Sequence, residues 1–284
     1  MTTNMTIFQA DPTKLSKGMR LILLAASILV LSAGLDLTLL TEQTTTSFAW
    51  TIQSSMTAAF LGAGYLASFL LEFLAYREKI WTNARVAVPS VFLFTTLTLV
   101  ATLLHLDKFH LYSPIFSAMV AAYLWLAIYI AVPIAMLILL IYQIRLQGST
   151  PKRKETLYTW MRLLLAAQGT VMLVTGIILF LFPATAFTFW PWALTPLTSR
   201  AIGAWLIGIG FIALHMTWEN DHQRNRIAYI SYALLGILQA LSLLRYAGEV
   251  NWSMAGSWIY LVFVISIIPI GLYGWKESRK IKID

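Results

Sequence analysis

The sequence predicts an all-α integral membrane protein with eight transmembrane helices, arranged as two parallel four-helix repeats. Three observations lead to this fold class. The 284 residues are 59% hydrophobic and only 11% charged, whereas soluble domains carry about 25% charged residues. Apolar runs of about 20 residues follow one another, and each is long enough to cross roughly 30 Å of hydrocarbon. Finally, the sequence of residues 19–39 resembles that of residues 161–181.

This internal similarity continues through the helices that follow. The offset between matching residues is 142 for the first pair of helices, 141 for the second and third, and 136 for the fourth. Four helices per repeat is an even number, so both repeats have the same orientation and are related by an axis along the membrane normal. The matched positions include Arg20 and Arg162, Gly34 and Gly176, Gly62 and Gly203, Arg85 and Arg226, Ser90 and Ser231, and Pro133 and Pro269.

The eight apolar runs divide the chain into two units joined by a short polar linker. We expect a cytoplasmic tail at 1–17, a first unit at 18–147, a cytoplasmic linker at 148–155, a second unit at 156–275 and a basic cytoplasmic tail at 276–284. The spanning helices are expected at residues 18–40, 49–75, 84–105, 115–143, 156–182, 197–218, 225–246 and 253–275.

The distribution of positive charge predicts the orientation. Of the 20 Lys and Arg residues, 17 fall on one side of the predicted membrane, and only Lys108, Arg200 and Arg245 fall on the other. Positive residues collect in cytoplasmic loops, so we expect both termini in the cytoplasm and the chain in a cell membrane of the bacterial inner-membrane type. Because the basic residues sit in short loops between apolar runs, the net charge of +8 does not indicate nucleic-acid binding.

Small residues and prolines mark particular helix faces. Ser55, Ala59, Ala63 and Ala67 form one small-residue stripe, and Ala204 and Gly208 begin another. Such stripes let helices approach closely in lipid, either within the chain or against membrane protein partners. Pro133 and Pro269 each remove a helical hydrogen bond. Two interpretations stay open for both prolines, a hinge and a packed kink.

The connection at 183–197 is the most distinctive loop. It carries no charge and contains Pro183, Pro191 and Pro196 together with Trp190 and Trp192. Tryptophan is enriched at membrane interfaces, so an interfacial anchor is the first interpretation. A lid over an outward-facing cavity is the second.

Ionisable residues inside or at the ends of spans are the candidates for a ligand site. Asp36, His105, Arg200 and Arg245 all fall near the outer ends of predicted helices. We expect them to line an outer vestibule between the repeats that binds a small anionic or zwitterionic solute. The alternative for Arg245 is a simple pair with Glu249, four residues on. Glu72 is expected to reach toward Arg77 or Lys79 at its helix end.

The sequence assigns no cofactor, metal or catalytic residue. His105, Asp107 and His110 are ligand types that Zn²⁺ or Cu²⁺ accepts, but their spacing matches no metal motif, and a solvated loop tip is the preferred interpretation. Cysteine is absent, which excludes thiolate chemistry. His105 and His215 lie near opposite helix ends, about 25 Å apart at 1.5 Å per residue, so they cannot clamp one haem.

Three functions remain open at this stage. The first is a transporter or permease-like protein for a small solute, which requires a water-filled path between the repeats. The second is a non-catalytic subunit of a larger membrane complex, which would have a closed core. The third is an intramembrane enzyme that acts on lipid or quinone, which would show a lateral opening with converging polar groups.

Overall fold

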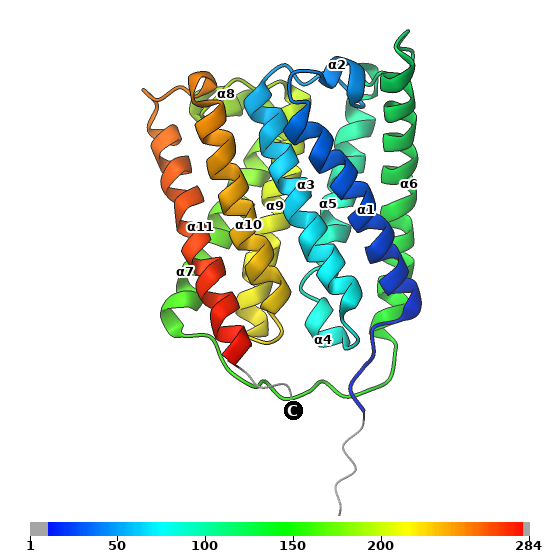
Figure 1. Ribbon diagram of the computed structural model, residues 1–284, viewed down its shortest axis with the longest axis vertical. Helices are drawn as coiled ribbons and strands as arrows, with labels where there is room; N and C mark the ends of the chain where they lie inside the picture. Colours follow the sequence, from blue (N-terminus) through cyan, green and yellow to red (C-terminus); the bar gives the residue numbers. More distant parts are fainter. Residues whose placement is uncertain (1–10, 281–284) are drawn as a thin grey trace, which may run out of the picture.

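Long antiparallel helices form one bundle, with the connecting loops gathered at its two ends (Figure 1). The computed structural model describes residues 11–280, so the expected tails at 1–17 and 276–284 lie partly outside the described residues. The described chain is all-α and contains no strand. Its long helices are α1 (Lys17–Leu39), α3 (Ser55–Arg77), α5 (Val88–Leu104), α6 (Phe116–Ile144), α7 (Thr159–Leu181), α9 (Pro196–Glu219), α10 (Arg226–Arg245) and α11 (Ala255–Lys280).

Short helical turns occupy the connections. At one end of the bundle lie α2 (Thr44–Ser47), η1 (Leu106–Lys108), η2 (Pro183–Thr185), α8 (Ala186–Phe189) and η3 (Ala247–Glu249). We call this the α8 end. At the opposite end lie α4 (Trp81–Ala84) and the connection between α6 and α7 (Figure 1). We call this the linker end.

Seven helices of the described chain, not eight, are long and apolar enough to cross a membrane. The prediction of eight spans is therefore wrong in its third member. Residues 85–87 form a turn after α4, and α5 begins only at Val88, with Pro89 in its first turn. The helix then ends at Leu104 after 17 residues. At 1.5 Å per residue it is about 25 Å long, which is shorter than the hydrocarbon core.

The main helix pairs correspond in the two halves of the bundle, although α1 also packs on α6 in the first half. In the first half α1 packs against α3 and α5 against α6, and in the second half α7 packs against α9 and α10 against α11. Contacts between the halves join α3 to α10 and α5 to α9. The helix pairs within each half and these contacts between the halves, together with a smaller one between α3 and α9, hold the bundle together.

Glycines set the closest of these contacts. A Cβ atom on Gly176 of α7 would lie 2.8 Å from the Gly203 carbonyl oxygen of α9, and one on Gly203 would lie 2.8 Å from the Gly176 carbonyl oxygen. In the first half a Cβ on Gly34 would meet Leu66, and one on Gly62 would meet Thr38. Only glycine allows backbones to approach this closely.

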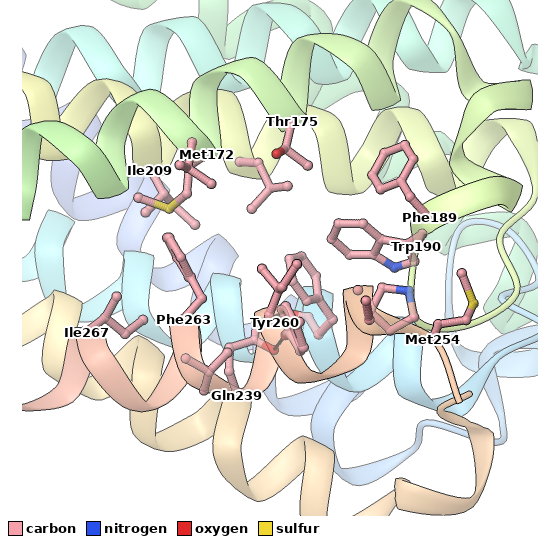
Figure 2. A pocket seen from close by; sticks show the side chains of 18 of the residues that line it. Met172, Thr175, Phe189, Trp190, Ile209, Gln239, Met254, Tyr260, Phe263 and Ile267 are labelled. Atoms are coloured by element: carbon pink, nitrogen blue, oxygen red, sulfur yellow. Dashed lines mark hydrogen bonds between the residues drawn. The ribbon is translucent and has the colours of Figure 1, made fainter. Parts of the chain in front are cut away.

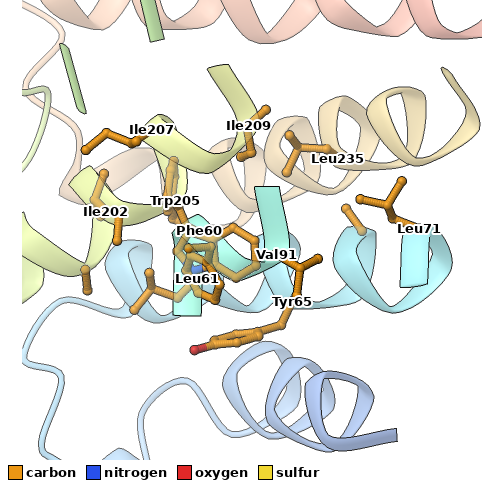
Figure 3. Packing of buried hydrophobic residues seen from close by; sticks show 14 of the residues in the cluster. Phe60, Leu61, Tyr65, Leu71, Val91, Ile202, Trp205, Ile207, Ile209 and Leu235 are labelled. Carbon is orange, nitrogen blue, oxygen red and sulfur yellow. The ribbon is translucent and has the colours of Figure 1, made fainter. Parts of the chain in front are cut away.

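The centre of the bundle is filled by large side chains from both halves (Figure 3). The Trp205 ring lies 4.0 Å from the Phe94 ring and 4.9 Å from the Tyr65 ring, measured between centroids. The small-residue stripes also face inward, since Ala63 is 2% and Ala204 0% exposed. These faces are therefore used within the chain, where they let α3 and α9 pack against their neighbours.

A buried ionic cluster ties the halves together at the linker end. The Glu219 side chain is fully buried at the end of α9 and pairs with Arg85, with Arg224 (3.1 Å) and with His215 (3.3 Å). Arg153 of the linker donates to the Glu219 carbonyl oxygen (2.8 Å). Charges removed from water need such compensation, and here it joins α9, the turn between α9 and α10, the linker and the first half.

Both predicted prolines lie inside continuous helices, Pro133 in α6 and Pro269 in α11. Pro133 is buried against the bundle, whereas Pro269 is exposed on its surface. The hinge role proposed for them from the sequence stays a proposal.

Candidate functional site: an apolar cavity in the second half

A cavity of about 600 Å³ lies among the helices of the second half (Figure 2). Ligand pockets for small molecules have volumes of about 300–1,000 Å³. Helices α7, α9, α10 and α11 form its walls, α3 contributes one residue, and the segment around α8 covers one end. The lining residues are Phe60, Val171, Met172, Thr175, Thr188, Phe189, Trp190, Pro191, Leu206, Ile209, Leu235, Gln239, Met254, Ala255, Gly256, Ile259, Tyr260, Phe263, Val264 and Ile267.

The connection after α7 forms the roof of the cavity. Pro183 begins η2, α8 follows directly, and Trp190 and Trp192 are then 6% and 5% exposed. The Trp192 Nε1 donates to Thr57 Oγ1 of α3 (2.9 Å). The Trp190 ring lies 5.1 Å from the Trp192 ring and 6.0 Å from the Tyr260 ring. Both indoles therefore pack against the bundle, and the anchor and lid interpretations of this segment both remain proposals.

The cavity opens sideways, between α7 and α11. Two of its lining residues, Val171 of α7 and Ile259 of α11, are 49% and 65% exposed. Deeper in the bundle the two helices are joined, because the Gln168 Nε2 donates to Ser266 Oγ (2.8 Å). For a bundle embedded in a bilayer, an opening between two apolar helices faces the lipid chains.

Polar groups are few in this lining. Gln239 of α10 uses both ends of its amide, since Nε2 donates to the Phe60 carbonyl oxygen (3.0 Å) and Oε1 accepts from the Tyr260 hydroxyl (3.0 Å). The Thr188 hydroxyl donates to the Thr185 carbonyl oxygen (2.7 Å). The Trp190 Nε1 is buried and has no hydrogen-bond partner.

A second, polar depression lies at the α8 end, where the two halves meet. It has a volume of about 280 Å³. The N-terminal caps of α3 and α9, Ser54 and Thr195, both face it, as does Glu249, which accepts from Ser54 Oγ (2.6 Å) and from the Met56 backbone N–H (3.2 Å). We call it the axial cup. Below it, the rings around Trp205 close the centre, and small cavities of about 40 and 20 Å³ lie beside them.

The structure brings two of the four predicted vestibule residues together. Arg200 Nη1 lies 2.7 Å from His105 Nε2. Arg245 instead donates to the Thr38 carbonyl oxygen (2.9 Å) and lies over the Tyr246 ring. No ion pair of the described chain joins Asp36 to an arginine, and the Asp36 Oδ2 is buried without a hydrogen-bond partner. None of the four lines the axial cup or the apolar cavity.

The histidines at the α8 end have protein partners of their own. His110 contacts the Phe48 carbonyl oxygen through Nδ1 and Thr51 Oγ1 through Nε2, each at 3.0 Å, while Asp107 pairs with Lys108 at the surface. Within the described residues no group of three His, Asp or Glu side chains is placed to hold a metal ion. Burial and the neighbouring Arg200 lower the pKa of His105, which favours its neutral form.

Glu72 occupies an unexpected place. It is 2% exposed in α3, and Oε1 accepts from Ser68 Oγ (2.8 Å) while Oε2 has no partner. It therefore stays inside the bundle rather than reaching Arg77 or Lys79. A carboxyl group without a cation in such a position is expected to be costly unless it is protonated.

Reasoning from the sequence missed the apolar cavity because it searched for ionisable residues. The signals were present in Gln239, a lone amide in an apolar span, and in the segment Trp190-Pro191-Trp192. No protein-family model matches this sequence, and no characterised protein or solved structure is significantly similar to it. Any function proposed for this chain is therefore inferred from its own geometry.

Proposed function

We propose that this multi-pass membrane protein binds a lipid-like, elongated apolar molecule in the cavity of its second half. The observation that carries the proposal is the lateral opening between α7 and α11 into about 600 Å³ lined by apolar and aromatic side chains. Apolar surface of this extent inside a bundle favours an apolar occupant. The third of the sequence-based hypotheses required such an opening. The lining, however, carries no ionisable side chain apart from Tyr260, which favours binding over catalysis.

Photolabelling in nanodiscs tests this proposal. We expect a diazirine-labelled hexadecane to label residues 171–175 and 254–267, and excess unlabelled hexadecane to compete. Val171 and Val174 are a matched pair, because both lie on α7 with 49% exposure and only Val171 lines the cavity. Val171→Trp should narrow the opening and reduce this labelling severalfold, while Val174→Trp should not. Labelling spread evenly over all lipid-facing helix surfaces would contradict the proposal.

A transport path along the centre of the bundle is a second candidate. The axial cup and the small cavities beneath it, which are lined in part by Ser68, Ser90 and Ser231, lie on the line between the halves. The outer vestibule of Asp36, His105, Arg200 and Arg245 belongs to this candidate, and Asp36→Asn and Arg245→Gln would then alter function. The chain has no cysteine, so a single Ser68→Cys is a clean reporter. If solutes pass along this path, a membrane-impermeant maleimide should label Ser68→Cys. The same reagent should label Gln53→Cys in the axial cup, which is the positive control.

We further propose that the halves are parallel repeats. The equal helix pairing and the glycines at matching positions support this. Two hydrogen bonds at the linker end support it as well. Asn83 donates to Glu78, and Arg224 donates to Glu219. Both the two donors and the two acceptors are 141 residues apart in the sequence. Cytoplasmic termini and partners on the lipid-facing surface remain proposals too, and a reporter fused to either terminus tests the orientation.

A further inference from the structure

The apolar cavity ends inside the bundle on a floor of four side chains, one from each helix of the second half. They are the deepest buried lining residues of their helices, namely Met172 of α7, Ile209 of α9, Leu235 of α10 and Ile267 of α11. All four are less than a tenth exposed. The three that Figure 2 labels lie at the end of the cavity opposite the roof. These side chains therefore bound the cavity toward the linker end.

A chain of hydrogen bonds supports this floor. The Tyr232 hydroxyl of α10 donates to Gln168 Oε1 of α7 (2.9 Å), and Gln168 Nε2 donates to Ser266 Oγ of α11 (2.8 Å). Tyr232 and Gln168 are both buried. Buried polar groups are costly to separate once they are paired, so this chain holds α7, α10 and α11 together at the level of the floor. The closed end is thus a fixed part of the fold.

The position of the floor gives the cavity a definite depth. The lining residues of α11 run from Ala255, at the α8 end, to Ile267 on the floor, which is twelve residue steps. At 1.5 Å per residue the depth is about 18 Å. One leaflet of a bilayer, half of a hydrocarbon core of roughly 30 Å, has a similar thickness. The cavity therefore has the length of a single extended apolar chain from one leaflet, comparable to hexadecane.

The floor is thin at one point. A smaller cavity of about 40 Å³ lies behind it, between α3, α9 and α10. Ile209 and Leu235 line both the large cavity and the small one, so their side chains form the wall between the two spaces. Shortening either side chain would join these spaces and lengthen the large cavity toward the linker end.

We infer that the cavity selects its ligand by chain length, and that Leu235 and Ile209 set the upper limit. The occupant is one unbranched apolar chain about as long as a leaflet is thick. It enters between α7 and α11 and lies with its far end on the floor. This inference rests on the proposed function, because it assigns the length of the same ligand.

Competition between chains of different length tests the limit. Diazirine-labelled hexadecane is bound to the full-length protein in nanodiscs, and unlabelled alkanes from dodecane to tetracosane compete at equal mole fractions of the lipid. We expect dodecane and hexadecane to compete well. Eicosane and tetracosane should compete about fivefold less well or worse, because a chain that is too long for a packed site has to bend or displace side chains.

Two variants of the wall move the limit. In Leu235→Ala, and separately in Ile209→Ala, eicosane should compete as well as hexadecane does, because the chain reaches the space behind the floor. Leu241→Ala is the matched control, since Leu241 also lies on α10 but is 54% exposed and does not line the cavity. It should keep the wild-type limit. Labelling by hexadecane in each variant shows that the cavity is intact.

The outcomes separate the two proposals. If hexadecane gives no saturable labelling of residues 171–175 and 254–267, the proposed function fails. If hexadecane labels these residues but eicosane and tetracosane compete equally well in the wild type, the cavity binds apolar chains without measuring them. A limit that stays the same in both Leu235→Ala and Ile209→Ala would overturn the role assigned to these two residues.

Discussion

At the α8 end, a connecting segment with a buried tryptophan covers the helices of each half. This tryptophan is Trp50 in the first half and Trp190 in the second. Trp50 lies on a filled space, because its ring is 4.8 Å from the Trp125 ring of α6 and 5.2 Å from the Phe109 ring. The space beside Trp190 is open, and the facing residues of α11 line the cavity.

The difference between the filled first half and the hollow second half has two causes. One is the size of the inward-facing side chains, and the other is the contact between α1 and α6. In the first half Trp125 and Tyr129 of α6 fill the interior, and α1 packs directly on α6. In the second half α11 presents Tyr260, Phe263 and Val264, and its link to α7 lies deeper, at Ser266. The same pairing of helices thus gives a closed half and a hollow half. We therefore propose that ligand binding, which needs an open cavity, takes place in the second half.

The largest effect is expected at the linker end, from a comparison of Glu219 with Glu78, which lies 141 residues before it. Glu219→Gln should lower the free energy of unfolding by about 3–5 kcal/mol, because it leaves the buried Arg224 and the half-buried Arg85 without their counter-charge. Glu78→Gln, in the first half, only weakens the hydrogen bond that Asn83 donates at a partly exposed site, and should cost less than about 1 kcal/mol. Denaturation in detergent measures both, and equal losses would contradict the central role of Glu219.

Truncation of an aromatic residue should separate the filled half from the hollow one. Trp125→Ala should cost about 3 kcal/mol, since it opens a new void in a packed interior and removes the hydrogen bond to Thr102. Phe263→Ala, which only enlarges an existing cavity, should cost markedly less. Thermal unfolding of both variants is the measurement. A larger loss for Phe263→Ala would show that the cavity is collapsed or filled in solution.

Glycine substitutions probe the two helix pairs at matching positions. Gly176→Ala should cost about 1–3 kcal/mol, because the new Cβ would meet backbone atoms of α9 at 2.8 Å. Gly34→Ala should cost less, because two of the three closest atoms belong to the flexible Leu66 side chain. Gly248→Ala, with open space around it, is the control for a neutral change in the same unfolding assay.

The smallest effect is a pH dependence carried by one histidine in each half. Burial lowers the pKa of His222 and, together with Arg200, that of His105 below the ordinary 6.5. The unfolded chain then binds more protons than the folded one, so stability should fall as the pH drops below about 6.5. His222, which is fully buried, should contribute more than His105. Comparison of unfolding at pH 7 and pH 5 for His222→Gln and His105→Gln checks this order, and unchanged pH slopes in both would contradict it.

The amino-acid sequence by itself determined where the long helices lie. In lipid every backbone polar group must be paired within its own segment, so an apolar run such as residues 159–181 becomes a helix whatever surrounds it. Each predicted span corresponds to a helix of the described chain, although α3 begins six residues later than expected, and α5 is too short to count as a span because a turn and Pro89 delay its start.

Only the tertiary structure decided what the helices enclose. Phe60, Trp190 and Tyr260 are distant in the sequence, and whether their side chains fill a space or border one depends on contacts that no local pattern records. The same holds for Glu219, whose partners come from the first half, from the linker and from the turn between α9 and α10. Helix formation is a local consequence of backbone hydrogen bonding, whereas a cavity is the difference between distant side-chain volumes, and that difference exists only in the folded chain.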